Sequence, residues 1–163
     1  MYRVGIITAS DKGSRGERVD ESGEKIKEIV SSFGYDIAYY KVLPDDKSVI
    51  SNEMKILCDE NLVDLILTTG GTGFSKRDNT PEATLEIADK IVPGISEAIR
   101  NYSMKFTKKA MLSRAVSVIR KETLIINMPG SPKAVKESME CIMPALDHGL
   151  DILKGTASEC AVK

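Results

Sequence analysis

The sequence predicts an α/β fold: a three-layer sandwich with a mostly parallel central sheet, helices on both faces, and an antiparallel addition at one edge. Apolar runs alternate with amphipathic helical patterns through residues 4–90, and this alternation is typical of parallel strands joined by helices. Two later apolar runs are separated only by Arg120-Lys121-Glu122, which fits a hairpin at the sheet edge. Neither a linker nor an internal repeat divides residues 1–163, so we expect a single domain.

The first half of the chain is expected to supply successive strand–helix units. The first helix shows an apolar stripe at helical spacing and ends at Gly34. The second follows Pro44-Asp45-Asp46, whose aspartates suit a helix start, and ends near Asn61. The third runs from Pro81 to about Lys90. The expected strands are rich in apolar, tyrosine and β-branched side chains and cover residues 4–9, 35–43 and 63–69.

The second half begins with a helix expected over residues 95–107. An amphipathic helix is expected after residue 133, and we expect Pro144 to interrupt it, because proline lacks the N–H that a helix interior needs. A last helical stretch covers residues 145–154 and carries His148, which we interpret as a structural or surface residue. The two strands of the edge hairpin are expected at residues 115–119 and 123–127.

The bulk composition excludes several classes of partner. The formal net charge of −1 gives no overall attraction for nucleic acid or an acidic membrane. No apolar run approaches the ~20 residues that a membrane span requires, and the chain moves directly into its first strand, so we expect no signal peptide and a cytoplasmic location. Cys58, Cys141 and Cys160 show no paired spacing and there is one histidine, which indicates a reducing compartment and no zinc site.

The most informative segment lies between the third strand and the third helix. It reads Thr69-Gly70-Gly71-Thr72-Gly73 and continues to Thr80-Pro81-Glu82. Glycines let the backbone approach a ligand closely, and their exposed N–H groups form an anion-binding concavity suited to phosphate. Thr80 is expected to cap the following helix, with Pro81 in its first turn.

Two common phosphate-binding motifs do not fit this glycine-rich segment. A P-loop is excluded because no Lys-Ser or Lys-Thr pair follows the last glycine, and a dinucleotide fingerprint is excluded because its third glycine is missing. A tight turn without a ligand is the plainer interpretation. The threonines and charges beside the glycines favour a binding site.

Loops that follow parallel strands should meet at one edge of the sheet, where α/β proteins bind ligands. The loops at 10–20, 44–46 and 70–78 are therefore expected to converge. Asp45, Asp46 and Asp78 are candidates for holding Mg²⁺ beside nucleotide phosphates, because that ion takes one or two carboxylates plus phosphate oxygens. Three acidic groups at one sheet edge beside an anion-binding turn would repel each other without a cation between them. Capping or turn formation is the alternative for each of them, because aspartate does this routinely.

A further strand-to-helix loop reads Asn127-Met128-Pro129-Gly130-Ser131-Pro132-Lys133. Ser131 and Lys133 open a helix whose free N–H groups and positive dipole end attract anions. Lys133 is otherwise a solvated charge. The loop is therefore a second candidate for anion contact.

Taken in order, these segments resemble the molybdenum cofactor biosynthesis proteins of the MogA/MoaB type. The resemblance spans nearly the whole chain. It rests on Ser10-Asp11-Lys12, Asp20-Glu21-Ser22-Gly23, Leu43-Pro44-Asp45-Asp46, Thr69-Gly70-Gly71-Thr72-Gly73, the run from Arg77 to Thr84, Ser113-Arg114-Ala115, and the run from Asn127 to Lys133.

The resemblance implies molybdopterin adenylyltransferase activity, in which ATP and the dithiolene pterin molybdopterin react with Mg²⁺ to give adenylyl-molybdopterin and pyrophosphate. Two aspartates matter to that chemistry in the family, and they fall on Asp45 and Asp78, the expected catalytic and metal-binding residues. The expected substrate- and nucleotide-binding residues are Ser10, Asp11, Thr69, Gly70, Gly71, Thr72, Gly73, Thr80, Pro129, Gly130, Ser131 and Lys133. The resemblance also implies a homotrimer and a downstream metal-insertion protein as a candidate partner.

Two alternative functions stay open. Some MoaB-type members do not catalyse the reaction, so a non-catalytic module that binds molybdopterin and hands it on would fit the same glycine-rich loop. A nicotinamide or flavin oxidoreductase follows only from the α/β pattern, and the missing third glycine disfavours it.

Overall fold

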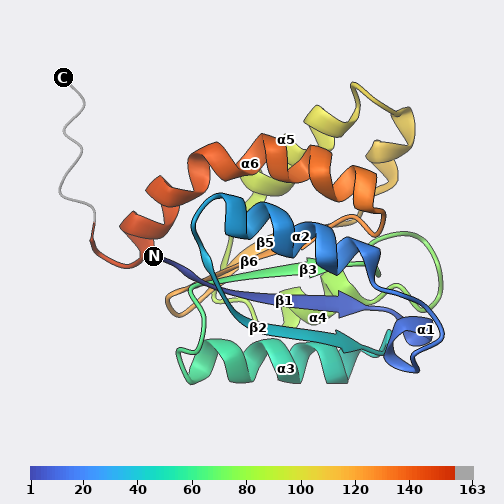
Figure 1. Ribbon diagram of the computed structural model, residues 1–163, viewed down its shortest axis with the longest axis horizontal. Coiled ribbons are helices and arrows are strands. Elements are labelled where there is room, and N and C mark those ends of the chain that lie inside the picture. Colours follow the sequence, from blue (N-terminus) through green and yellow to red (C-terminus); the bar gives the residue numbers. More distant parts are fainter. Residues whose placement is uncertain (157–163) are drawn as a thin grey trace.

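A six-stranded sheet forms the centre of the molecule in the computed structural model, which describes residues 1–156 (Figure 1). Its strand order is β2-β1-β3-β6-β5-β4. The first four of these strands are parallel to one another, and at one edge β5 pairs antiparallel with β6 and β4 pairs antiparallel with β5. The predicted mostly parallel sheet with an antiparallel edge is confirmed. The strands are β1 (Arg3–Ala9), β2 (Asp36–Leu43), β3 (Leu65–Thr69), β4 (Lys90–Ile91), β5 (Ser117–Arg120) and β6 (Thr123–Met128).

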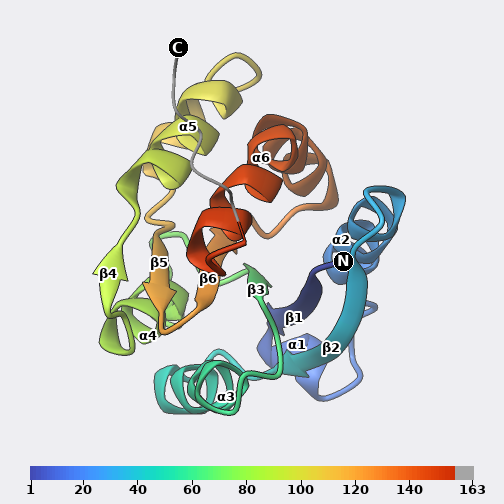
Figure 2. The same ribbon diagram turned by 90° about the vertical axis from the view of Figure 1, so that its left-hand side faces the viewer.

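Helices cover both faces of this sheet, as Figure 2 shows in end view. One face carries α2 (Glu21–Ser32), α5 (Pro93–Ser103) and α6 (Pro132–Leu153), and the other carries α3 (Lys47–Asp59) and α4 (Thr80–Glu86). Side chains of β1 alternate between the two cores: Val4 and Ile6 pack toward α2 and α6, and Ile7 packs toward α3. Two short elements lie in the connections, α1 (Asp11–Ser14) and a 3-10 helix (Lys108–Leu112).

The helix expected from Pro81 to about Lys90 is shorter than predicted. It ends at Glu86, and Lys90–Ile91 forms the edge strand β4. The backbone N–H of Asp89 donates to the carbonyl of Ile119 at 2.9 Å, which starts the pairing with β5. The prediction was wrong because a two-residue strand has no periodicity of its own, and its state is decided by the partner strand.

Thr80 does not cap α4, contrary to the prediction. Asn79 occupies the N-cap position, and Thr80 is the first helical residue. Its backbone N–H donates to the carbonyl of Gly71 at 3.2 Å, which ties the start of the helix to the glycine-rich turn. Asp46, by contrast, does cap α3, because its carboxylate accepts from the N–H of Val49 at 3.0 Å.

Pro144 does not interrupt α6, which continues to Leu153. Proline removes the bond that would reach the carbonyl of Glu140. Both Pro144 and Glu140 are exposed, so water can satisfy that carbonyl, while the buried face through Met139, Met143 and Leu146 holds the helix on the sheet.

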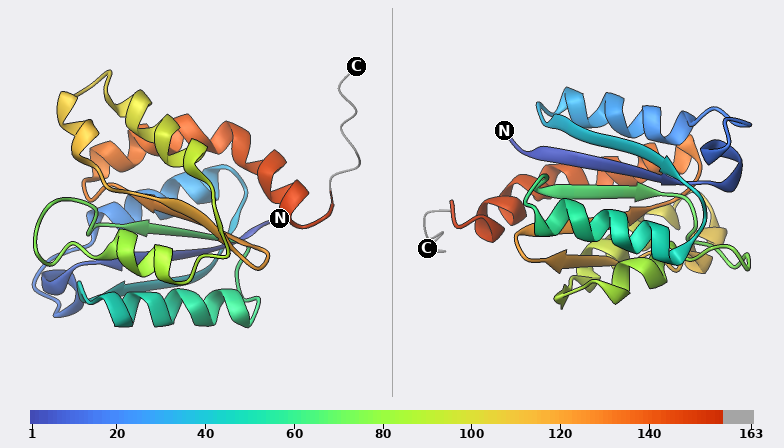
Figure 3. Two further views of the ribbon diagram at one scale, coloured as in Figure 1. Left: turned by 180° about the vertical axis from the view of Figure 1, so that it is seen from behind. Right: turned by 90° about the horizontal axis from the view of Figure 1, so that it is seen from below.

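The parallel strands determine where the connecting loops gather. In both views of Figure 3 the arrowheads of β1 and β3 point to the same end of the molecule, from which their following loops extend. Among residues 1–156, none of the helices combines the length and apolar character that crossing a bilayer requires.

Candidate active site

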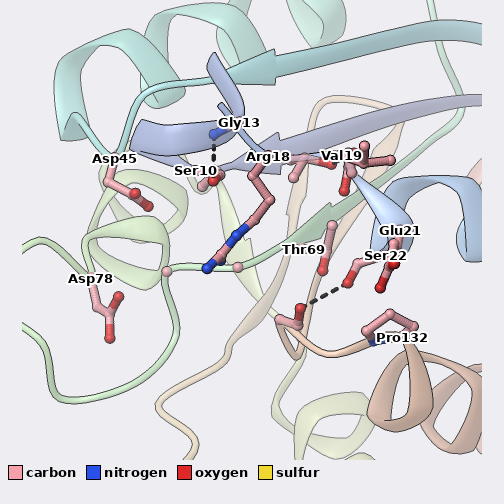
Figure 4. A pocket seen from close by; sticks show the side chains of 16 residues that line it. Ser10, Gly13, Arg18, Val19, Glu21, Ser22, Asp45, Thr69, Asp78 and Pro132 are labelled. Atoms are coloured by element: carbon pink, nitrogen blue, oxygen red, sulfur yellow. Dashed lines mark hydrogen bonds between the residues drawn. The ribbon is translucent and has the colours of Figure 1, made fainter. Parts of the chain in front are cut away.

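A cavity of about 550 Å³ lies at the carboxyl ends of the parallel strands (Figure 4). Its walls come from the loops after β1, β2, β3 and β6, so the predicted convergence of the loops at 10–20, 44–46 and 70–78 is confirmed. The lining residues that the sequence had predicted for a site are Ser10, Asp45, Thr69, Gly70, Gly71, Asp78 and Gly130.

The floor of this cavity includes a turn that only glycine can form. Gly70 and Gly71 have φ angles of 89° and 68°, in the left-handed region that L side chains rarely adopt. A Cβ on Gly70 would lie 2.4 Å from the carbonyl oxygen of Ala9, and one on Gly71 would lie 2.3 Å from Oγ1 of Thr80. The turn therefore brings its backbone within reach of any molecule in the cavity, with no side chain between them.

Asp45 is held in place by Asp11. The backbone N–H of Asp11 donates to Oδ2 of Asp45 at 2.8 Å, and the backbone N–H of Asp45 donates to Oδ1 of Asp11 at 3.0 Å. The guanidinium of Arg77 also donates to the Asp11 carboxylate, from Nε to Oδ2 at 3.0 Å and from Nη2 to Oδ1 at 2.8 Å. Its guanidinium lowers the pKa of Asp11, so that carboxyl stays ionised.

Burial, aided by the charges of Asp11 and Asp78, raises the pKa of Asp45 above its ordinary value. Figure 4 shows Asp45 and Asp78 on the same side of the cavity. Two partly desolvated carboxylates that repel each other are stabilised by a cation between them.

Asp78 is held by its own loop and by Arg114. Its Oδ2 accepts from the N–H of Ser75 at 3.0 Å. Arg114 donates to the carbonyl of Asp78 at 2.8 Å and to the carbonyl of Gly73 at 2.7 Å, and it forms an ion pair with Glu82 on α4. One guanidinium thus joins both ends of the glycine-rich loop to the helix that follows. The sequence interpretation missed this role, because the arginine lies far along the chain.

Thr80 carries a polar atom without a partner. Its side chain is fully buried, and Oγ1 makes no hydrogen bond to any of the described residues. That atom lies beside Gly71, where an added methyl group would also lie 3.5 Å from Oδ1 of Asp45. Buried hydroxyls are normally satisfied, so Thr80 indicates that a water or ligand atom completes this corner.

The remaining expected site residues lie elsewhere. Thr72, Gly73 and Pro129 line a second, smaller cavity of about 280 Å³, together with apolar side chains such as Ile99 and Leu112. Asp11 and Thr80 do not line the first cavity themselves. Asp11 contacts the lining residue Asp45, and Thr80 lies next to the lining residue Gly71.

Ser131 and Lys133 line neither cavity. The hydroxyl of Ser131 accepts from the N–H of Ala134 at 3.2 Å and caps α6. The side chain of Lys133 is 84% exposed and lies 4.0 Å from the carboxylate of Glu137. Ser131 is thus used as the N-cap, where its hydroxyl satisfies a first-turn N–H that has no acceptor within the helix.

Sequence interpretation also missed part of the cavity wall between β1 and α2. Arg18, Glu21 and Ser22 line it, and the hydroxyl of Ser22 donates to the carbonyl of Gly130 at 2.8 Å (Figure 4). Asp20 caps α2. Two signals were available: the position of residues 10–20 after a parallel strand, from which only Ser10 and Asp11 were taken as site residues, and the Asp20-Glu21-Ser22-Gly23 segment, which entered only through the family resemblance.

His148, Cys58 and Cys141 line neither of the described cavities. His148 is exposed on α6, as predicted. Cys58 is buried in the core, which raises the pKa of its thiol to about 11, and Cys141 is half-buried. Cys160 lies outside the described residues.

Comparison with known protein families shows to which family this chain belongs. The sequence pattern of the family described as "Probable molybdopterin binding domain" matches residues 5–148. The chain belongs to this molybdopterin-binding domain family. The matched range includes every loop of the cavity and both aspartates.

Relatives within the molybdopterin-binding domain family cover most of the chain. The molybdopterin adenylyltransferase of Helicobacter pylori (strain ATCC 700392 / 26695) is 40% identical over 93% of this chain and 88% of its own length. The molybdopterin adenylyltransferase of Escherichia coli (strain K12) is 40% identical over 88% of this chain and 74% of its own length. The crystal structure of the molybdopterin biosynthesis enzyme MoaB from Thermus thermophilus superposes with a TM-score of 0.90, at 45% identity, over 95% of this chain and 98% of that one.

Proposed function

We propose that this chain is a molybdopterin adenylyltransferase of molybdenum cofactor biosynthesis, which uses ATP and Mg²⁺ to adenylylate molybdopterin. The observation that carries the proposal is that Asp45 and Asp78, from separate loops, line one cavity with the glycine turn. Relatives that bear this enzyme's name are 40% identical over most of the chain. In the proposed step a phosphate oxygen of molybdopterin bonds to the α-phosphorus of ATP, the bond to the β-phosphate oxygen breaks, and pyrophosphate leaves.

The residues present fit a magnesium ion shared with a nucleotide. Within residues 1–156 no group of three or more His, Cys, Asp or Glu could hold a metal alone. Two carboxylates suit Mg²⁺, which binds through one or two of them and takes its other ligands from phosphates and water. Thr80 supports this assignment, because its unpartnered Oγ1 offers a further oxygen beside Asp45. Bound there, Mg²⁺ would neutralise charge on the phosphates during transfer.

The rest of the chemistry is positioning and charge stabilisation by the protein. In this proposal the N–H groups of the Gly70–Gly71 turn bind phosphate oxygens, and Asp11 and Arg114 fix the two aspartates. The second cavity combines apolar side chains such as Ile99 with polar ones such as Arg100 and Ser103, which suits a flat heterocycle with polar edges, so we assign the pterin ring to it. Because Gly71 lines the first cavity and Gly73 the second, the glycine-rich loop lies between the two substrates.

The experiment that tests the proposal measures pyrophosphate release from ATP, Mg²⁺ and molybdopterin. Asp78→Asn should abolish release, because it removes one negative ligand, while molybdopterin binding survives. Asp46→Asn is the matched control, since Asp46 caps α3 and asparagine caps as well. Full turnover by Asp78→Asn would contradict the mechanism. Tight molybdopterin binding by the wild-type chain without release of pyrophosphate would instead favour the non-catalytic hand-over module.

We also propose a cytoplasmic homotrimer that passes its product to a downstream metal-insertion protein. The homotrimer is supported by the resemblance to the MogA/MoaB type and by exposed apolar side chains at Phe106, Met111 and Leu112. Light scattering should give three times the 17.8 kDa chain mass.

A further inference from the structure

Arg18 supplies the one cationic side chain among the described residues that line the larger cavity. In Figure 4 its side chain extends from the loop after β1 into the cavity, toward the centre of the lining residues. The carboxylates of the same lining come from Asp20, Glu21, Asp45 and Asp78. A cavity of this composition repels a polyphosphate unless cations offset the carboxylates, so the position of Arg18 matters.

Arg18 makes no hydrogen bond or ion pair with any of residues 1–156. Two acidic neighbours along the chain, Glu17 and Asp20, already have partners of their own. Glu17 pairs with Arg15, at 2.8 Å from Nε. The Asp20 carboxylate accepts from the N–H of Gly23 at 2.9 Å and from the hydroxyl of Tyr40 at 2.8 Å. The guanidinium of Arg18 therefore keeps its fork of N–H donors free for a ligand.

The loop that carries Arg18 is fixed at both ends. The N–H of Ser10 donates to the carbonyl of Leu43 at 2.8 Å, and the N–H of Glu17 donates to the carbonyl of Lys12 at 3.0 Å. At the other end Asp20 caps α2. The backbone thus holds the arginine over the cavity, and only its side chain has to be ordered when a ligand binds.

We propose that Arg18 is a substrate-contacting residue that binds phosphate oxygens in this cavity. The inference rests on the proposed function, since it assumes that phosphorylated substrates occupy the site. A planar guanidinium matches two oxygens of one phosphate, which adds affinity and fixes orientation. The phosphate belongs either to the polyphosphate of ATP or to the terminal phosphate of molybdopterin. Measuring the binding of each ligand separately distinguishes these two sources.

The test measures by calorimetry the dissociation constants of inorganic pyrophosphate, of ATP with Mg²⁺, and of molybdopterin. Arg18→Gln should weaken at least one of these by about tenfold, the size expected for a lost hydrogen bond to a charged group. Arg18→Lys should recover part of the lost affinity, because lysine keeps the positive charge but lacks the planar set of N–H donors of the guanidinium. Arg15→Gln is the matched control: the residue lies three positions earlier in the same loop, does not line the cavity, and should leave all three constants unchanged.

Weaker binding of pyrophosphate and ATP, with molybdopterin unaffected, would assign the contact to the nucleotide, and the reverse would assign it to the pterin phosphate. Unchanged binding of all three ligands by Arg18→Gln would overturn the inference. Failure of the wild-type chain to bind ATP or to release pyrophosphate would instead refute the proposed function. Arg18 is exposed and forms no hydrogen bond or ion pair with residues 1–156, so thermal melting of Arg18→Gln should match the wild type.

Discussion

Asp11 and Asp45 each accept a hydrogen bond from the other's backbone N–H, at 3.0 Å and 2.8 Å. The pair joins the loop after β1 to the loop after β2 at the rim of the cavity. Because both carboxylates are used in this way, the position of Asp45 depends on Asp11, and the position of Asp11 depends in turn on Arg77.

Asp11→Ala should therefore act through Asp45. The change removes the acceptor for the Asp45 N–H and releases Arg77, so we expect the Mg²⁺ concentration for half-maximal activity to rise about tenfold, as for one lost charge-assisted hydrogen bond. Magnesium titration of pyrophosphate release measures this. Glu17→Gln breaks a surface ion pair with Arg15 in the same loop and should change nothing. An unaltered magnesium requirement in Asp11→Ala would show that Asp45 needs no such support.

Arg114 should prove to be a positioning residue for Asp78. Arg114→Ala removes the bonds to the carbonyls of Gly73 and Asp78 and leaves Glu82 without its partner. We expect kcat to fall by at least about tenfold and the free energy of unfolding to fall by about 2 kcal/mol.

Glu82→Gln separates these two effects of Arg114, because it removes the ion pair and keeps both carbonyl bonds. It should lower stability and leave kcat within about threefold of the wild type. Steady-state kinetics and urea unfolding of both variants provide the comparison. Equal losses of kcat in Arg114→Ala and Glu82→Gln would mean that the ion pair supports activity, and that the hydrogen bonds from Arg114 to the loop carbonyls do not.

The fold and the position of the cavity could be predicted from the sequence because they depend on repeated local signals. The apolar runs that form β1, β3 and β6 are continuous and fully or nearly fully buried. The position of the cavity follows from the rule that ligands bind at the carboxyl ends of parallel strands. Asp46 was foreseen as a cap candidate because its position before an amphipathic run is a local feature.

Features that depend on distant contacts could not be predicted in this way. Strand β4 exists because β5 pairs with it, and Pro144 is tolerated because the carbonyl of Glu140, which loses its donor, belongs to an exposed residue that water can reach. Thr80 begins α4 instead of capping it because its N–H reaches back to Gly71. Arg18 carries no motif. Its proposed role emerges only from the structure, where it lines the same cavity as the glycine turn and Glu17 is paired with Arg15.

Gly71→Ala should abolish activity and destabilise the chain. A Cβ there would lie 2.3 Å from Thr80 Oγ1, and the residue has a φ of 68°. We expect a loss of more than about 2 kcal/mol, since strain from the left-handed backbone adds to the clash. Gly16→Ala is the matched control, with a φ of 75° and nothing within 4 Å of an added Cβ. It should cost only the backbone strain of about 1 kcal/mol and keep its activity. Chemical unfolding and the pyrophosphate assay together test this, and equal losses in the two variants would show that backbone strain alone is responsible.

The ion pairs of Asp64 should make stability depend on pH. Its side chain, 6% exposed, lies 2.8 Å from Arg3 and 2.9 Å from Lys154, and so joins β1 to the end of α6. Burial alone would raise the pKa of Asp64, but the bonds from Arg3 and Lys154 outweigh it and hold the pKa well below its usual range.

Since the unfolded chain then binds more protons than the folded one below about pH 4, the stabilisation is complete above that pH and is lost as the pH falls toward the folded value. Asp64→Asn should therefore lower the free energy of unfolding by about 2 kcal/mol at neutral pH, and by less in acid, where the wild type loses the same contribution. Urea unfolding at about pH 7 and about pH 3 measures the difference. The exposed Asp36, whose side chain makes no hydrogen bond to the described residues, is the control, and Asp36→Asn should change stability by less than about 0.5 kcal/mol at either pH. A deficit in Asp64→Asn that stayed the same at both values would show that packing, and not charge, is what this carboxylate contributes.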